Sequence, residues 1–142
     1  MTVKFGSLYA GVGGIDKGME QAGFELAWAN EVDSHACQTY RFNHDPEKLI
    51  EEDVYNLDMS QLGAIDLLTA GFPCQPFSLA GVSKKNSLGR EHGFRDEAQG
   101  TLFFDVVRIL EHHRPEAFML ENVKNLTSHD KGKTFEVIMG TL

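Results

Sequence analysis

Cysteine is scarce in this 142-residue sequence, which contains only Cys37 and Cys74. Two cysteines cannot build the disulfide framework of a small secreted domain, so a reducing, cytoplasmic setting is expected. No apolar run approaches the roughly 20 residues that a membrane helix needs. The first residues, MTVKFGSLYAGVGG, also lack the pattern of a signal peptide. These absences argue against a secreted disulfide scaffold and against a membrane protein.

Basic residues are outnumbered, with 13 Lys and Arg against 21 Asp and Glu and a net charge of −8. Taken as a whole, this balance argues against a nucleic-acid-binding protein. The charge is unevenly spread, however, because residues 79–95 carry four bases and one acid. This stretch is also rich in Gly, Ser and Asn, so we expect a basic loop. A solvated surface loop and a nucleic-acid contact both remain open on charge alone.

Proline is rare as well, yet two of the four prolines flank Cys74 in GFPCQPFS, Gly71 to Ser78. Proline fixes its own backbone and restricts the residue before it, so the chain is stiffened on both sides of Cys74. A rigid frame matters little for a cysteine in the core and much for a reactive one. A buried, inert cysteine and a nucleophile both remain open at this point.

The order of the predicted elements indicates an α/β fold. Strand and helix patterns alternate, which predicts a doubly wound, mostly parallel sheet in the order 3-2-1-4-5 with helices on both faces. The expected strands are 5–9, 24–30, 49–52, 65–70 and 117–120, and the expected helices are 15–22, 34–42, 102–113 and 133–142, with Ser34 and Thr101 as N-caps. The 42% hydrophobic content and the absence of repeats or linkers predict a single domain with a sizeable core.

The stretch YAGVGG follows the first expected strand and precedes the first expected helix. Glycines at such a turn let backbone N–H groups approach a ligand closely. Glu31 follows 20 residues after Gly11, at the end of the second strand, where an acid can bind ribose hydroxyls. Together these features predict an adenosine-containing cofactor. They do not separate NAD from S-adenosylmethionine, although the full G-x-G-x-x-G of dinucleotide sites is absent.

Cys74 and Glu121 follow neighbouring strands of the expected sheet. Because parallel strands present their carboxyl ends at one edge, we expect both side chains to face one crevice. A carboxyl group beside an apolar strand end can act as a general acid there. No metal is expected, because Pro73-Cys74 lacks the second cysteine of the deaminase motif P-C-x-x-C and no H-x-E occurs.

Five ordered motifs resemble those of the DNA cytosine-5 methyltransferases. SLYAGVGGID is similar to the first cofactor motif of that family, and NEVD, Asn30 to Asp33, is similar to the second. GFPCQPFS resembles the catalytic motif, GTLFFDVVRIL the fifth, and LENV, Leu120 to Val123, the sixth. The segments SLAGVSKKNSLGR and ENVKNLTSHDKGKTF look particularly like the bacterial Dcm-type enzymes. The resemblance covers nearly the whole chain.

The resemblance implies a Rossmann-like fold that binds S-adenosylmethionine and releases S-adenosylhomocysteine. The implied reaction is methyl transfer to carbon 5 of a cytosine flipped out of double-stranded DNA. Cys74 would bond transiently to carbon 6 of the ring, and Glu121 would stabilise the charge that develops on it. A restriction–modification or Dcm-like role is expected, in the bacterial cytoplasm and at the nucleoid when DNA is bound.

The resemblance also implies roles for individual residues, motif by motif. Pro73, Gln75, Ser78 and Asn122 would support the catalytic loop. Cofactor contacts are expected from Tyr9, Gly11, Gly13, Gly14, Glu31, Val32, Asp53, Val54 and Leu102. Lys84, Lys85 and Arg90 in the basic loop would contact DNA phosphates.

Three departures from the family pattern stand out. Tyr9 stands where Phe is usual, and Gln99 stands where many members have Arg. The eighth, ninth and tenth motifs and the target recognition domain are absent. We therefore expect residues 1–142 to be the N-terminal part of a catalytic domain that stops after its fifth strand. Alone it is expected to fold poorly or to be inactive. A truncated piece, a damaged gene product and one chain of a split enzyme, whose companion chain carries the recognition domain, all remain open as its origin.

Other functions stay open at this stage. A non-catalytic module could keep the cofactor fold and only bind partners, and an NAD-dependent oxidoreductase could carry a similar glycine turn. A relative that methylates cytosine in transfer RNA would share the motifs. Titration with S-adenosylmethionine and NAD, and a comparison of DNA and RNA acceptors, would distinguish these functions.

Overall fold

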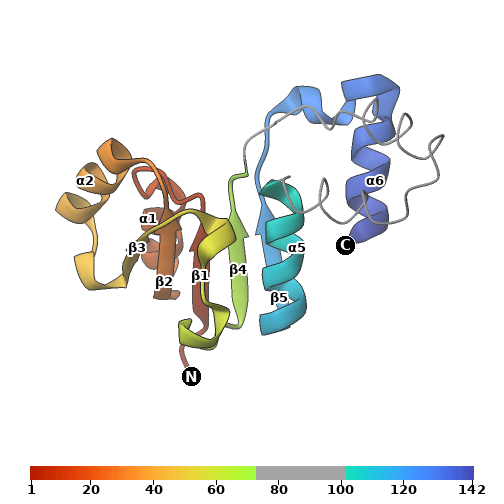
Figure 1. Ribbon diagram of the computed structural model, residues 1–142. Coiled ribbons are helices and arrows are strands. Elements are labelled where there is room, and N and C mark those ends of the chain that lie inside the picture. Colours follow the sequence, from red (N-terminus) through yellow and green to blue (C-terminus); the bar gives the residue numbers. More distant parts are fainter. Residues whose placement is uncertain (73–101) are drawn as a thin grey trace.

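The computed structural model describes residues 1–72 and 102–142. Its centre is a five-stranded sheet, formed by β1 (Lys4–Leu8), β2 (Glu25–Glu31), β3 (Leu49–Glu51), β4 (Leu67–Ala70) and β5 (Ala117–Leu120). The strands lie in the order β3-β2-β1-β4-β5, and every neighbouring pair is parallel (Figure 1). The predicted α/β class and strand order are therefore confirmed.

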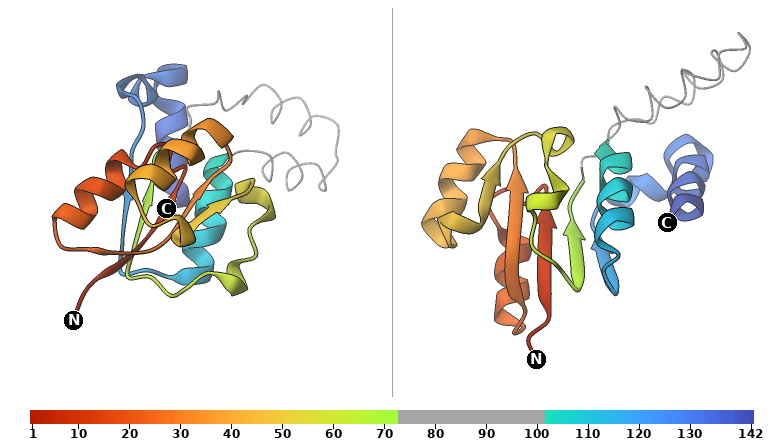
Figure 2. Two further views of the ribbon diagram at one scale, coloured as in Figure 1. Left: turned by 90° about the vertical axis from the view of Figure 1, so that its left-hand side faces the viewer. Right: turned by 60° about the horizontal axis from the view of Figure 1, so that its bottom comes forward.

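Helices cover the two faces of this sheet. The described α-helices are α1 (Gly14–Gln21), α2 (Ser34–Asn43), α5 (Leu102–His113) and α6 (Lys133–Thr141). Figure 2 shows α1 and α5 on opposite faces, as expected of a doubly wound fold. Within residues 1–72 and 102–142, no helix has the length and apolar character needed to cross a membrane.

Short 3₁₀ helices form much of the remaining described chain. They are η1 (Pro46–Lys48), η2 (Val54–Asn56), η3 (Met59–Gln61), η4 (Lys124–Thr127) and η5 (His129–Gly132). The first three each follow an aspartate, Asp45, Asp53 or Asp58, whose side chain accepts a hydrogen bond from the backbone N–H two residues later. Aspartate offers the backbone this local bond readily, so it starts each turn.

The sheet separates two apolar cores. One lies against α5 and is formed largely by Leu8, Trp28, Leu68, Phe103, Val106 and Ile109. The other lies against α2 and is formed by Phe5, Leu26, Ala29, Cys37, Tyr40 and Leu49. The central strand β1 is buried from Phe5 to Leu8 because both of its faces are covered.

The start of α2 differs from the sequence-based expectation. Asp33, and not Ser34, is the N-cap: its backbone is extended, and its side chain accepts a 2.7 Å hydrogen bond from the N–H of Ala36. The prediction was wrong by one residue because Ser and Asp are both good N-caps and stand next to each other here. Thr101, the predicted cap of α5, lies outside the described residues.

Replacing Asp33 by alanine should lower the free energy of unfolding by about 1 kcal/mol, because an N–H group in the first turn of α2 loses its acceptor. The matched control is Ser34→Ala, which removes a polar side chain one residue later and should change stability by less than about 0.5 kcal/mol. Urea unfolding of both variants measures the difference. A larger loss for Ser34→Ala would contradict the assignment of the cap.

Candidate active site

The glycine turn between β1 and α1 lies at the carboxyl edge of the sheet. Tyr9, Gly11 and Gly13 have φ angles of 54°, 58° and 88°, so the turn uses the left-handed region three times. A Cβ atom on Gly11 or Gly14 would meet nothing within 4 Å, so the outer surface of the turn is open. The turn can therefore present its backbone to a ligand.

Glu31 joins this turn to the end of β2. Its carboxylate accepts hydrogen bonds from three backbone N–H groups, those of Gly11 (2.8 Å), Val32 (2.8 Å) and Asp33 (2.9 Å). A carboxylate has about four acceptor positions, so capacity remains for one more donor. The side chain is thus fixed in place and can still accept a hydrogen bond from a ligand hydroxyl.

A hollow of about 420 Å³ opens beside Glu31. It is lined by Tyr9, Asn30, Glu31, Val32, Asp53, Val54, Gly71 and Leu102. The lining is mainly apolar, with two carboxylates at its border, and its size lies within the range of about 300–1,000 Å³ typical of ligand sites. Six of the nine predicted cofactor residues meet here, and the remaining three are the glycines of the adjacent turn.

Two hydrogen bonds to backbone carbonyls hold the walls of this hollow together. The Tyr9 hydroxyl donates to the carbonyl of Leu102 (2.7 Å), which joins the glycine turn to the start of α5. Arg108 donates to the carbonyl of Val54 (2.8 Å) and pairs with Asp105 (3.1 Å). Burial, followed by the nearby carboxylates of Asp105 and Asp53, raises the pKa of the Tyr9 phenol, so it remains a hydrogen-bond donor.

Glu121 and Asn122 lie at the end of β5, next to the chain that leads to Cys74. Glu121 Oε2 is 3.6 Å from the position that a Cβ atom on Gly71 would occupy. The Asn122 amide donates to the carbonyl of Phe72 (2.7 Å) and accepts a hydrogen bond from the N–H of Val123 (2.8 Å). Both side chains are therefore directed at Gly71-Phe72, the two residues before Pro73-Cys74.

Several predicted residues fall on the part of the chain that is not described. Pro73, Cys74, Gln75 and Ser78 lie outside the described residues, and so do Lys84, Lys85 and Arg90. Their predicted roles stay predictions. Where the chain is described, no cluster of three or more His, Cys, Asp or Glu side chains is arranged to hold a metal ion.

Three residues of the site carried no predicted role. Asn30 is buried and donates from its amide to the carbonyls of Ile50 (3.0 Å) and Glu52 (2.8 Å), which fixes the chain that leads to Asp53. Gly71 lines the hollow, and Arg108 holds the carbonyl of Val54, which also lines it. A polar residue at the end of a buried strand was a signal for Asn30, whereas the contact of Arg108 depends on tertiary packing.

Comparison with known proteins assigns the chain to a family. Residues 3–142 match the model of the C-5 cytosine-specific DNA methylases. The chain belongs to this family. The DNA-cytosine methyltransferase of Escherichia coli (strain K12) is 51% identical, with 98% of this chain and 34% of that protein covered. Type II methyltransferase M.Bsp6I of Bacillus sp. (strain RFL6) is 46% identical, with 99% and 42% covered. The chain thus spans between a third and a half of the length of these methylases.

Solved structures of related methyltransferases share the fold. A putative DNA modification methyltransferase encoded within an Escherichia coli prophage superposes with a TM-score of 0.72 at 24% identity, covering 99% of this methylase chain and 38% of that one. Dnmt2 methyltransferase of S. pombe gives a TM-score of 0.64 at 19% identity, with 97% and 40% covered. At these identities the likeness establishes the architecture alone.

Proposed function

We propose that this chain forms the cofactor-binding and catalytic part of a DNA cytosine-5 methyltransferase. The observation that carries the proposal is the adjacency of two groups of residues at one edge of the sheet. The hollow beside Glu31 includes Gly71 in its wall, and Glu121 and Asn122 approach Gly71-Phe72 from β5. A methyl donor in the hollow would therefore lie beside the segment that carries Cys74.

The size of the hollow and the chemistry of its lining residues suit S-adenosylmethionine. Tyr9, Val32, Val54 and Leu102 supply apolar walls for an adenine ring, and Glu31 supplies an acceptor for ribose hydroxyls. Asp53 stands at the same wall, although its carboxylate already accepts a hydrogen bond from the N–H of Tyr55 (2.9 Å). When bound, the cofactor supplies the methyl group.

The chain's own residues would act in two stages, addition to the cytosine ring and later elimination from it. The Cys74 thiolate adds to carbon 6 of a flipped cytosine, and Glu121 places a proton at ring nitrogen 3 as negative charge develops there. Carbon 5 thereby becomes nucleophilic and takes the methyl group. Loss of the carbon 5 proton to a base then breaks the bond between sulfur and carbon 6, and the nitrogen 3 proton returns to Glu121. Asn122 holds the Phe72 carbonyl, which fixes the segment that leads to Cys74.

The proposed substrate is double-stranded DNA, bound with the help of the basic stretch between residues 79 and 95. Lys84, Lys85 and Arg90 are proposed to contact backbone phosphates, which position a duplex without reading its sequence. The whole chain has a net charge of −8 although this stretch is net positive, so the rest of the chain is acidic and would repel DNA phosphates.

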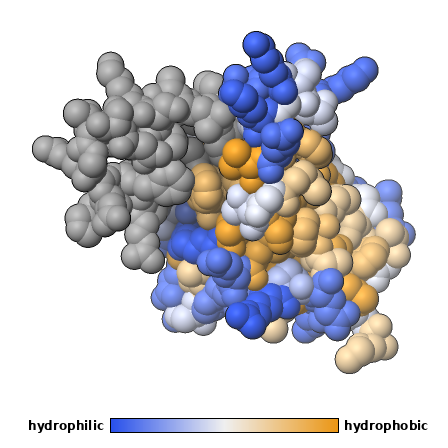
Figure 3. Space-filling model, turned by 90° about the vertical axis from the view of Figure 1, so that its right-hand side faces the viewer, coloured by the Kyte–Doolittle hydropathy of each residue, from blue (hydrophilic) through white to orange (hydrophobic). Residues whose placement is uncertain are grey.

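Activity is proposed to need a further part of the methyltransferase, which docks on the surface formed by β5 and α6. Phe118 and Met119 on β5 and Phe135, Met139 and Leu142 near α6 are exposed, although large and apolar. Figure 3 shows apolar side chains gathered on the side of the molecule that carries α5, β5 and α6. A patch of this kind on an outer strand marks an interaction surface.

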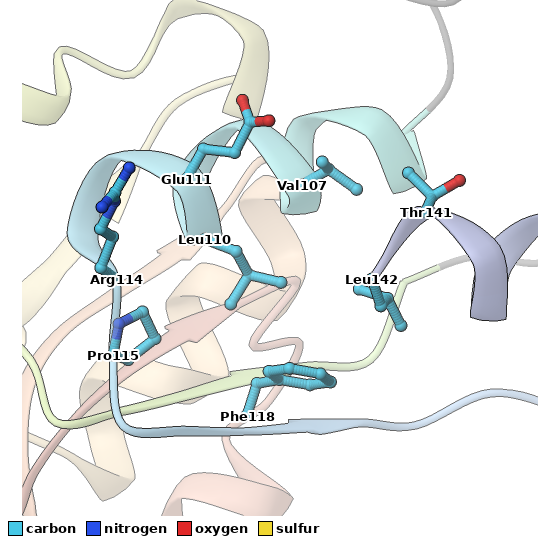
Figure 4. A pocket seen from close by; sticks show the side chains of 8 residues that line it. All are labelled: Val107, Leu110, Glu111, Arg114, Pro115, Phe118, Thr141 and Leu142. Atoms are coloured by element: carbon cyan, nitrogen blue, oxygen red, sulfur yellow. The ribbon is translucent and has the colours of Figure 1, made fainter.

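A cavity of about 320 Å³ lies within this β5–α6 surface. Phe118, Leu110 and Leu142 converge on it from β5, α5 and the end of α6 (Figure 4). The proposed occupant is the part that the E. coli relative has outside its match to this chain, because the match covers only 34% of that protein. Apolar side chains from such a part would fill the cavity and cover β5.

The cofactor assignment is tested by titration of the chain with S-adenosylhomocysteine and with NAD. We expect binding of S-adenosylhomocysteine and none of NAD. Glu31→Ala should weaken the binding by about tenfold to a hundredfold, because it removes both the ribose acceptor and the anchor of Gly11. Calorimetry gives the affinities. Glu25→Ala, at the opposite end of β2, is the matched control and should bind normally. Preference for NAD would overturn the assignment.

A further inference from the structure

The glycine turn is strained and needs support from its surroundings. Tyr9 has a φ angle of 54°, in the left-handed region that a residue with a side chain rarely adopts. Gly11 and Gly13 occupy the same region within the next four residues. A strained backbone of this kind persists only where neighbouring groups determine it. Buried groups behind the glycine turn provide this support.

Asp16, in the first turn of α1, lies directly behind the turn. Its side chain is fully buried, and its two oxygens accept hydrogen bonds of 2.6 Å each, one from the Ser7 hydroxyl and one from the Tyr40 hydroxyl. Burial raises the pKa of the Asp16 carboxyl, while the two hydroxyl donors act in the opposite direction. A buried carboxyl is costly unless its hydrogen bonds are complete, and here both oxygens have a donor.

These two hydrogen bonds enclose the turn. Ser7 stands two residues before Tyr9, and Asp16 stands three residues after Gly13, so the bond between them closes a loop that contains the whole turn. Tyr40 comes from α2 and attaches the same carboxyl to a third element. The cluster of Ser7, Asp16 and Tyr40 therefore fixes both ends of the turn relative to the sheet.

Aromatic rings support the turn from the same side. The rings of Tyr40 and His44 stack with centroids 4.3 Å apart. A Cβ atom on Gly13 would overlap the imidazole of His44 and lie 2.9 Å from the Tyr40 ring. The backbone of Gly13 is thus pressed against the ring whose hydroxyl binds Asp16.

We infer that Asp16, Ser7 and Tyr40 are positioning residues for the cofactor: they hold the glycine turn in the geometry that presents its backbone N–H groups. The inference rests on the proposed function, in which the hollow beside this turn binds S-adenosylmethionine. None of the three lines the hollow, so they act through the turn and not by touching the ligand. Preorganisation of a loop increases affinity because less ordering is needed on binding.

The decisive variant is Tyr40→Phe, which removes the hydroxyl and keeps the ring that packs on Gly13. Its affinity for S-adenosylhomocysteine, measured by calorimetry well below the unfolding temperature, should fall by about fivefold to tenfold. Ser7→Ala provides a second, independent variant with the same expectation. Leu26→Val should lower stability in the same core while keeping all three hydrogen-bonding side chains, and it should leave the affinity unchanged.

A local readout separates positioning from a general loss of stability. In the free protein, the amide NMR signals of Gly11 and Gly13 should shift, and their hydrogen exchange should accelerate, in Tyr40→Phe and Ser7→Ala but not in Leu26→Val. The signal of Leu68, in the centre of β4, should stay unchanged in all three. Asp16→Asn, which keeps an acceptor for Ser7, should retain more affinity than Asp16→Ala.

Unaltered glycine signals together with unaltered affinity in Tyr40→Phe would overturn the inference. A different failure would concern the proposed function alone: if the unmodified chain did not bind S-adenosylhomocysteine, the cofactor assignment would fall. In that case the amide signals of Gly11 and Gly13 would still decide whether the cluster holds the turn.

Discussion

The 142-residue chain alone should transfer no detectable methyl groups to DNA, and activity should appear when the part of a relative that this chain does not match is supplied in trans. A suitable partner is the segment of the E. coli DNA-cytosine methyltransferase that begins where its match to this chain ends. At 51% identity, the surface that this segment normally contacts should be largely preserved. Incorporation of tritiated methyl groups into DNA should rise at least about a hundredfold on mixing, because the complete site positions both reactants.

The docking surface can be tested in the same assay. Phe118 lines the cavity between α5, β5 and α6, so Phe118→Asp should bury an unpaired charge against the partner and abolish the gain. Phe42→Asp is the matched control, since Phe42 is 90% exposed on α2 at the far side of the sheet. That variant should complement normally. Turnover by the unmixed chain, or full complementation by Phe118→Asp, would contradict the proposal, as would self-association of the chain through this surface.

Much of the sheet could be predicted because local patterns and tertiary structure agree there. β5 and α6 begin where expected, since Pro115 and Gly132 stand just before them and short apolar runs follow. The strand order followed from the alternation of strands and helices, which permits few arrangements of a parallel sheet. β4 begins at Leu67, two residues later than expected, because apolar Ile65 packs in the core without pairing in the sheet.

The site was less accessible to prediction where it depends on contacts between distant residues. The motifs indicated Glu31, and its position at the end of β2 suggested a ligand, but its three bonds to backbone N–H groups could not be read from the sequence. The hydrogen bonds around Asp16 were even harder to predict from the sequence. Ser7 and Tyr40 are 9 and 24 residues away from it, and no local pattern pairs a helix carboxyl with a strand serine.

The two cysteines of this chain should respond in opposite ways to the same substitution. In the complemented methyltransferase, Cys74→Ser should reduce methyl transfer by on the order of a thousandfold or more, because a hydroxyl forms far less of the nucleophilic anion than a thiol. The affinity for S-adenosylhomocysteine should stay within about twofold of the original, since serine is nearly the same size. Scintillation counting and calorimetry measure the two effects separately.

Cys37→Ser serves as the matched control. Cys37 is fully buried on α2, and its thiol lies 3.5 Å from the carbonyl of Glu31. Burial, followed by the carboxylates of Glu51 and Glu31, raises the pKa of this thiol, so it remains protonated and unreactive. Its replacement should cost some stability and leave the rate of methyl transfer nearly unchanged.

Duplex DNA containing 5-fluorocytosine then identifies the nucleophile directly. Fluorine on carbon 5 cannot leave as a proton does, so the bond between sulfur and carbon 6 cannot be broken and the chain stays attached to the DNA. With the complementing segment and S-adenosylmethionine present, a band shifted on a denaturing gel should form with the original chain and with Cys37→Ser, and should be absent with Cys74→Ser. If Cys74→Ser still gave the shifted band, the attacking atom would lie elsewhere and the covalent mechanism proposed for this chain would be wrong.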